Sequence, residues 1–144
     1  MKTAETFAEL SHARRLHVGA IVVKDDRIIS IGYNGMPAGW DNNCETETVE
    51  LYSGYEGAIH RTVLKTKPEV LHAEMNALMK LAKSNESGDE ATMFITHAPC
   101  IDCAKGMYQA GIKQVFYKTE YRDTAGLDFL NKCGLEIEQV KEDE

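Results

Sequence analysis

Two short runs of aliphatic and β-branched residues dominate the hydrophobic pattern near the start of the chain. VGAIVV at 18–23 and IISIGY at 28–33 are joined by a tight KDDR turn, which predicts an antiparallel β-hairpin. Ahead of them, Phe7 and Leu10 belong to a helical spacing that extends over 3–15, although its apolar face is thin. We therefore expect one helix followed by one hairpin.

The second half of the chain alternates between helical and strand-like patterns. The predicted order is a helix over 71–82, a strand over 91–96, a helix from Cys100 to Gly111, a strand over 112–117, a helix over 124–132 and a strand over 135–140. Such alternation implies βαβ crossovers with parallel strands. The expected fold class is therefore α/β, with a mixed sheet of about five strands and helices on both faces.

The segment between these halves has a weaker pattern. NGMPAGWDNN at 34–43 is dense in Gly, Asn and Pro and predicts a loop. The residues from 45 to 70 are ambiguous, and we interpret them as a compact insertion with a short helix at TETVELY, 46–52, and a loop up to Pro68. No repeat or linker divides the chain, so residues 1–144 are expected to form a single domain.

Composition narrows the class of protein. Of the 144 residues, 43% are hydrophobic and 27% are charged, which is typical of a chain that buries a core. The net charge of −7 argues against a polynucleotide partner, because nucleic-acid affinity comes from clustered Lys and Arg. No apolar run suits a membrane span or a signal peptide. We expect a cytoplasmic protein without a membrane partner, whose four cysteines stay reduced.

Two of these cysteines and one histidine have the spacing of metal ligands. Cys100 and Cys103 stand three apart at the start of a predicted helix, so both sulfurs face one side and the helix N-terminus favours thiolates. His72 stands at the start of the preceding predicted helix. If the two helices pack side by side, one imidazole and two thiolates can surround a single ion.

This donor set suits Zn²⁺. Three protein ligands leave the fourth tetrahedral position to water, which is typical of a catalytic rather than a structural site. Zinc lowers the pKa of such a water to about 7. Glu74 would not share a helical face with His72, so we assign it proton transfer instead of metal binding. The combination suits attack on an electrophilic ring carbon with loss of ammonia.

The order H-x-E followed by P-C-x-x-C is typical of zinc-dependent nucleobase and nucleoside deaminases. Two other interpretations use the same residues. A core histidine with two small buried cysteines would leave the coincidence of both motifs unexplained. A redox C-x-x-C pair lacks the tryptophan-glycine-proline context of the thioredoxin site.

The chain from about residue 16 to 140 resembles the deoxycytidylate (dCMP) deaminases, including those of bacteriophages. The segments that carry the resemblance are VGAIVV, GYNGMPAG at 32–39, HAEMNAL at 72–78, PCIDCAK at 99–105 and QAGIKQVFY at 109–117. GYNGMPAG separates this family from cytidine deaminases of free nucleosides and from tRNA adenosine deaminases. The resemblance implies the three-layer α/β/α sandwich of cytidine deaminases and the hydrolysis of dCMP to dUMP and ammonia, which supplies thymidylate synthesis.

By the same resemblance, His72, Cys100 and Cys103 are the zinc ligands and Glu74 is the proton shuttle. The amide of Asn34 is expected to hold the sugar, although Asn34-Gly35 can also serve only to shape a turn. The candidates for binding the phosphate, each of which could instead be a solvated side chain, are Arg15, His17, Tyr121 and Arg122.

Many members of this family are hexamers that dCTP activates and dTTP inhibits. The resemblance thus implies a homohexamer with an effector site near Asn34, Gly35, Met36 and the acidic ETETVE segment. Some phage relatives hold a second, structural zinc ion. Here the only candidate ligands are Cys44 and His60, and two ligands do not close a site, so we expect none.

Three rival functions remain open. Another zinc deaminase could act on a free cytosine nucleoside, a guanine or a pteridine-like ring. A zinc-binding interaction module would use the thiolates without chemistry, and Glu74 would then be dispensable. A polynucleotide-editing deaminase shares both motifs, but it would need a basic, aromatic-lined groove that the acidic composition argues against.

Overall fold

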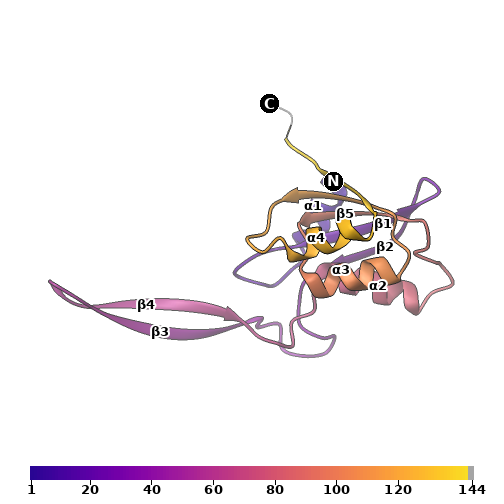
Figure 1. Cartoon of the computed structure of the whole chain (residues 1–144). Helices are drawn as coiled ribbons and strands as arrows, with labels where there is room; N and C mark the ends of the chain where they lie inside the picture. The colour runs from indigo at the N-terminus through magenta and orange to yellow at the C-terminus, as the bar shows by residue number, and fades with distance from the viewer. Residues whose placement is uncertain (143–144) are drawn as a thin grey trace.

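The computed structural model describes residues 1–142 and contains one central sheet (Figure 1). Its strands are β1 (Gly19–Lys24), β2 (Arg27–Tyr33), β5 (Thr92–His97), β6 (Gln114–Thr119) and β7 (Glu136–Gln139), in the spatial order β2-β1-β5-β6-β7. β1 pairs antiparallel with β2 and β5, whereas β5, β6 and β7 are parallel. The expected mixed five-stranded sheet is confirmed.

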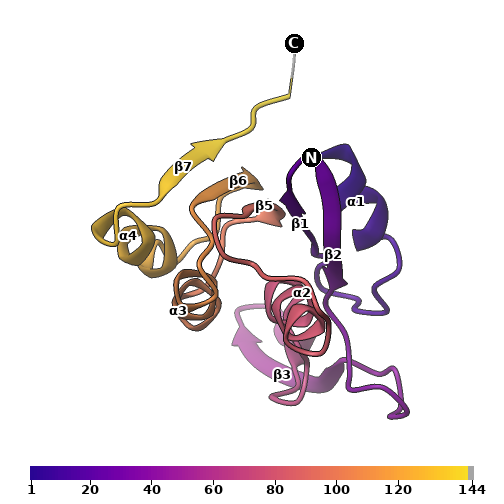
Figure 2. The same ribbon diagram turned by 90° about the vertical axis from the view of Figure 1, so that its right-hand side faces the viewer.

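Helices cover both faces of this sheet (Figure 2). They are α1 (Lys2–Ala8), α2 (Ala73–Ala82), α3 (Ile101–Gln109) and α4 (Ala125–Lys132). Gly32 pairs with Ala20, the neighbour of Gly19, so Gly19 and Gly32 lie on opposite faces of the sheet. A Cβ on Gly19 would lie 2.0 Å from the Ala4 carbonyl oxygen, and one on Gly32 would lie 2.1 Å from that of Ala73. Glycine thus lets α1 approach one face and α2 the other, while α3 lies beside α2 and α4 lies beside α3. The result is the expected α/β/α sandwich.

The main core lies between the sheet and the layer of α2, α3 and α4. Its large members occur at every second position along the strands and every three to four positions on the inner faces of the helices. These are the side-chain periods of a strand and of a helix. They include Val22, Met93, Ile95, Val115, Leu78, Leu81, Met107 and Leu130, all of which are buried. Each such side chain stabilises the fold by roughly 1.5–3 kcal/mol. This burial fixes α2 and α3 against the same face of the sheet.

The helix predicted over 3–15 is too long. α1 ends at Ala8, and residues 11–18 form a loop. Beyond α1, Ser11 Oγ donates to the Asn34 carbonyl at 2.8 Å, and the main-chain N–H groups of Arg14 and Arg15 donate to Glu45 Oε1, at 2.8 and 3.1 Å, instead of to carbonyls one helical turn earlier. Tertiary contacts therefore hold the residues after α1 in a non-helical conformation, against the helical pattern of the sequence.

The short helix predicted at 46–52 is wrong, and the insertion is not compact. β3 (Glu45–Gly54) and β4 (Gly57–Thr66) pair antiparallel as a separate two-stranded hairpin, which we call the arm, and it extends away from the body of the molecule (Figure 1). Gly54 and Gly57 flank its two-residue turn, and Gly57 has a φ of +118°, which favours glycine. The β-branched residues Thr46, Thr48 and Val49 of β3 suit a strand better than a helix.

The other predicted elements are found within a few residues of their expected bounds. The KDDR turn joins β1 to β2 with φ values of 50° and 60° at Asp25 and Asp26, as a type I′ hairpin turn requires. Within residues 1–142, none of the helices combines the length and the apolar character needed to cross a bilayer.

Candidate metal centre and active-site cavity

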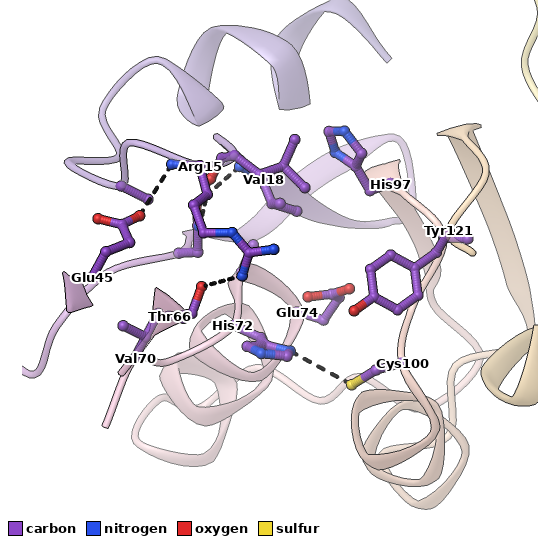
Figure 3. Close-up of a pocket in the computed structure, with 15 residues that line it drawn as sticks. Arg15, Val18, Glu45, Thr66, Val70, His72, Glu74, His97, Cys100 and Tyr121 are labelled. Carbon is purple, nitrogen blue, oxygen red and sulfur yellow. Dashed lines mark hydrogen bonds between the residues drawn. The ribbon is translucent and has the colours of Figure 1, made fainter. Parts of the chain in front are cut away.

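A cavity of about 290 Å³ opens over the N-terminal ends of α2 and α3 (Figure 3). Its size is near the lower limit of small-molecule sites, roughly 300–1,000 Å³. Its lining comes from the loop before β1, the end of β2, the base of the arm, the segments around both helix starts and the loop after β6. The residues are Ala13, Arg15, Leu16, Val18, Asn34, Glu45, Thr66, Val70, His72, Ala73, Glu74, His97, Ala98, Cys100 and Tyr121.

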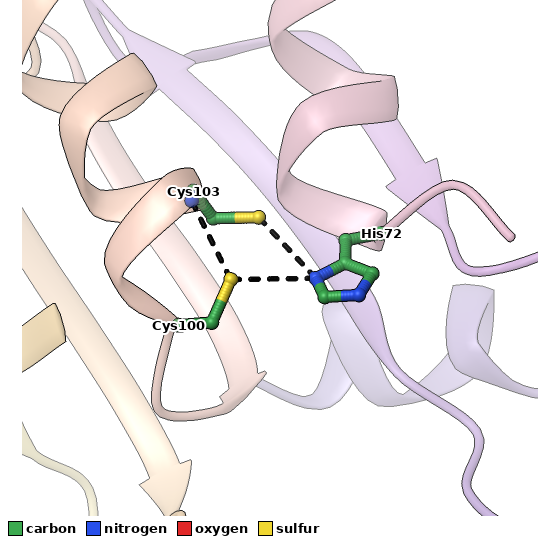
Figure 4. Close-up of side chains that lie close together, drawn as sticks. All are labelled: His72, Cys100 and Cys103. Atoms are coloured by element: carbon green, nitrogen blue, oxygen red, sulfur yellow. Dashed lines mark hydrogen bonds between the residues drawn. The ribbon is translucent and has the colours of Figure 1, made fainter. Parts of the chain in front are cut away.

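Two of the predicted metal ligands are the N-cap residues of their helices. His72 precedes α2 with φ −74° and ψ 151°, and Cys100 precedes α3 with φ −70° and ψ 167°. Both are extended, as is usual for N-caps, so their side chains face the helix start and not the helix flank. Cys103 lies one turn into α3 and is buried. The structure therefore brings together all three predicted ligands (Figure 4).

The spacing of their donor atoms fits a zinc ion. Cys100 Sγ and Cys103 Sγ each lie 3.5 Å from His72 Nδ1, and the three donor atoms lie within 4.8 Å of one another. Tetrahedral zinc at about 2.3 Å from sulfur and 2.0–2.1 Å from nitrogen would separate these atoms by about 3.5–3.6 Å. One imidazole and two sulfurs thus match the edges of a zinc tetrahedron, as the sequence predicted.

The electrostatics of the pair of cysteines also favour a cation. Hydrogen bonds with Cys103 and His72 lower the pKa of Cys100 to about 4, so this sulfur is a thiolate at neutral pH. Hydrogen bonding with Cys100 and burial raise the pKa of Cys103. The contact with Cys100 raises the pKa of His72. A divalent ion between these groups would displace the second thiol proton, because only thiolates bind such metals.

Glu74 has the properties of a proton carrier. It lies in the first turn of α2, is only 4% exposed and lines the cavity beside His72. Burial raises the pKa of Glu74 to about 7. A carboxyl group in this range can take up and release a proton near neutral pH, which is the role that the sequence assigned to it.

The predicted substrate residues fall into two groups. Arg15 and Tyr121 line the cavity, and in Figure 3 the Arg15 guanidinium lies above His72 while Tyr121 stands on the opposite side near Glu74. His17 and Arg122 are exposed and are not part of the lining. Their contact with a substrate stays a prediction.

Asn34 lines the cavity, but its amide already has partners. Its Oδ1 accepts from the Val18 N–H at 2.9 Å, and its Nδ2 donates to the Leu16 carbonyl at 2.8 Å. The next residue, Gly35, exchanges two main-chain hydrogen bonds with Leu71, which precedes His72. Met36 follows in the loop and is half-buried. This segment therefore ties the loop before β1 to the start of α2.

Sequence reasoning missed three polar residues of the lining, Glu45, Thr66 and His97. Glu45 and Thr66 come from the base of the arm, which the sequence pattern did not reveal as a hairpin. Of the two candidates for a second metal site, Cys44 is buried beside this base, whereas His60 is exposed and faces Leu51 across the ladder of the arm.

Comparison with known proteins supports the same chemistry. Residues 1–119 match the family described as the cytidine and deoxycytidylate deaminase zinc-binding region. The chain is 35% identical to the deoxycytidylate deaminase of Enterobacteria phage T4 over 152 residues, covering 85% of this chain and 78% of that protein. It is 36% identical to ComE operon protein 2 of Bacillus subtilis (strain 168) over 145 residues, covering all of this chain and 70% of that protein.

A solved structure of high similarity is the dCMP deaminase of the cyanophage S-TIM5 in complex with dCMP and dUMP. It superposes with a TM-score of 0.83 at 46% sequence identity, and the match covers 96% of this chain and 92% of that one. The arm and the body of this chain are both included in a match of that extent.

Proposed function

Because this chain belongs to the cytidine and deoxycytidylate deaminase family, we propose that it hydrolyses dCMP to dUMP and ammonia. The observation that carries the proposal is the convergence of one imidazole, two cysteine sulfurs and a buried carboxyl group at a cavity that an arginine also lines. Named deoxycytidylate deaminases among the relatives support dCMP as the substrate.

His72, Cys100 and Cys103 would hold the zinc ion. When bound, zinc supplies Lewis-acid activation of a water molecule at neutral pH. The carboxylate of Glu74 takes a proton from the attacking water, and the resulting carboxyl group returns it to the departing amino group at C4 of the cytosine ring. Water adds to C4, the C4–N bond breaks, and the products are dUMP and ammonia. Proton transfer of this kind accelerates a reaction by roughly 10²–10⁴-fold.

The remaining residues bind and orient the nucleotide. Arg15 and Tyr121 line opposite sides of the cavity, which supports the Arg15 guanidinium as a ligand of the 5′-phosphate. His17 and Arg122 lie in the loops next to these two residues and are further candidates for the phosphate. Asn34 can still offer its second Nδ2 hydrogen and a free lone pair on Oδ1 to the sugar.

Regulation and assembly form a second part of the proposal. The chain acts in the cytoplasm as a homohexamer that dCTP activates and dTTP inhibits, with Asn34, Gly35 and Met36 at the effector site. The main-chain bonds between Gly35 and Leu71 support this placement, because Leu71 precedes the metal ligand His72. A nucleotide bound to this loop could therefore shift His72.

Ammonia release from dCMP, deoxycytidine and CMP by the zinc-loaded protein tests the proposal. We expect strong preference for dCMP, activation by added dCTP and inhibition by dTTP. Equal turnover of deoxycytidine and dCMP would contradict the monophosphate as substrate and favour a nucleoside deaminase. Unchanged rates with both triphosphates would contradict the regulation alone.

A further inference from the structure

The base of the arm lies at the edge of the active-site cavity. Glu45 and Thr66 are directly opposite partners at the end of the β3–β4 ladder nearest the body, and both line the cavity. Directly opposite residues of an antiparallel pair point to the same face. Glu45 and Thr66 are 21 positions apart in sequence, and the hairpin thus presents their side chains together to the loop of residues 11–18.

Glu45 fixes the main chain of this loop. Its side chain is 1% exposed, and its Oε1 accepts from the N–H groups of Arg14 and Arg15 at 2.8 and 3.1 Å. Its Oε2 has no hydrogen-bond partner among the described residues and lies 3.5 Å from Arg14 Nε. A buried carboxylate is tolerated only when donors and a cation compensate it, so this contact holds the loop in one position.

Thr66 fixes the side chain of Arg15. Arg15 Nη1 donates to Thr66 Oγ1 at 3.1 Å, and in Figure 3 this contact holds the guanidinium over the cavity. The guanidinium has five N–H donors, so the others remain free for an anion. Asn34 holds the loop on the far side of Arg15, through Leu16 and Val18. Arg15 is therefore held through its main chain, its side chain and its neighbours.

We propose that Glu45 and Thr66 are positioning residues that hold Arg15 for the 5′-phosphate of the substrate, so that the base of the arm helps to select a nucleoside monophosphate over a nucleoside. This inference rests on the proposed function. An arginine that is already held loses less rotamer freedom on binding phosphate, and this preorganisation appears as affinity. The arm is thereby part of substrate selection, although most of its length lies away from the cavity.

Kinetics of Thr66→Val with dCMP and deoxycytidine tests the role of the hydroxyl. The isosteric change removes the acceptor for Arg15, and we expect KM for dCMP to rise roughly three- to tenfold, by more than KM for deoxycytidine. Thr66→Ser keeps a hydroxyl and should restore most of the preference. Thr62→Val is the matched control, because Thr62 lies on the same face of β4 but is exposed and outside the cavity.

A double-mutant cycle separates positioning from a direct contact between Thr66 and the substrate. If Thr66 acts through Arg15, Thr66→Val has no further effect on KM for dCMP in the Arg15→Ala background. Glu45→Gln should raise KM for dCMP when Arg15 is present and should have no effect on KM in the Arg15→Ala protein. Glu50→Gln, in the exposed part of β3, is its control. Thermal unfolding of each variant reports any loss of fold separately.

The outcomes distinguish this inference from the proposed function. A wild-type protein that does not prefer dCMP would overturn the proposed function. A wild-type protein that prefers dCMP, together with Thr66→Val and Glu45→Gln variants that keep the full preference, would overturn the positioning role alone. Additive effects of Thr66→Val and Arg15→Ala would show independent action and would also overturn it.

Discussion

His72 and Cys100 cap two neighbouring helices, and their side chains meet with Nδ1 3.5 Å from Sγ. The two residues are 28 positions apart, so their contact depends on how α2 and α3 pack against the sheet. Cys103 joins them from the first turn of α3, because residues three apart share a helical face. The metal centre therefore forms where the N-terminal ends of α2 and α3 meet, and any shift of either helix would change the distances between the ligand atoms.

Loss of any one ligand should abolish tight metal binding. We expect His72→Ala, Cys100→Ala and Cys103→Ala to purify with far less than one zinc ion per chain and without activity, because two ligands do not hold zinc in a tetrahedral site. Elemental analysis of the purified proteins measures this. Cys133→Ser is the control, since Cys133 follows α4 and takes no part in the cluster. Full zinc content in the Cys100→Ala protein would contradict the assigned ligand set.

The role of Glu74 predicts a separation of metal binding from turnover. Glu74→Gln keeps the size of the side chain but cannot carry the proton, so we expect full zinc content and a rate of ammonia release lower by roughly 10²–10⁴-fold. Zinc analysis and the dCMP assay on the same preparation check both. A variant that keeps normal turnover would favour a non-catalytic use of the metal centre.

β2 and α2 lie so close together at Gly32 that one added methyl group there should strongly destabilise the fold. Gly32→Ala would place its Cβ 2.1 Å from the carbonyl oxygen of Ala73, next to His72. We expect the free energy of unfolding to fall by about 1–3 kcal/mol or more, and zinc affinity to fall with it, because α2 must shift. Urea unfolding followed by circular dichroism measures the first effect.

Gly35→Ala is the matched control for this change. No atom lies within 4 Å of a Cβ at Gly35, and its φ is not positive. Its effect on the free energy of unfolding should stay within about 0.5 kcal/mol. If Gly32→Ala lowered the free energy of unfolding no more than Gly35→Ala does, the result would contradict the close packing of α2 on β2.

His97 gives the protein a pH-dependent contribution to stability. Burial lowers the pKa of His97, so the folded state binds its proton less readily than the unfolded state does. The unfolded histidine titrates near about pH 6.5. Below this pH the unfolded state binds more protons, so the free energy of unfolding falls as the pH is lowered through about 6.5 and further towards the lower pKa of the folded state.

Replacement of His97 should therefore weaken acid destabilisation. We expect the fall in the free energy of unfolding between pH 7.5 and pH 5.5 to be smaller in His97→Gln than in the wild-type protein. Urea unfolding at both pH values, with the same zinc loading, measures the difference. An identical fall in both proteins would exclude a contribution from His97.

The sequence by itself determined the elements of the body and the chemistry of the metal centre. The alternation of strands and helices after residue 70 reflects local hydrophobic periodicity, which depends on few neighbours. Zinc ligands likewise have a local signature, because Cys100 and Cys103 must share one helical turn and His72 must stand at a helix start. The assignment of Glu74 to proton transfer and not to metal binding also rests on helical geometry, and it stays a prediction.

Only the tertiary structure decided the arm and its contacts with the loop of residues 11–18. The pairing of Glu45 with Thr66 depends on the register of two ten-residue strands, and this register is set by a turn that the sequence pattern left ambiguous. The non-helical course of residues 14–15 depends in turn on Glu45, which accepts hydrogen bonds from the main-chain N–H groups of Arg14 and Arg15, 31 and 30 positions earlier in the chain. Local periodicity contains no information about such partners, because a side chain that binds a distant backbone leaves no regular spacing in the sequence.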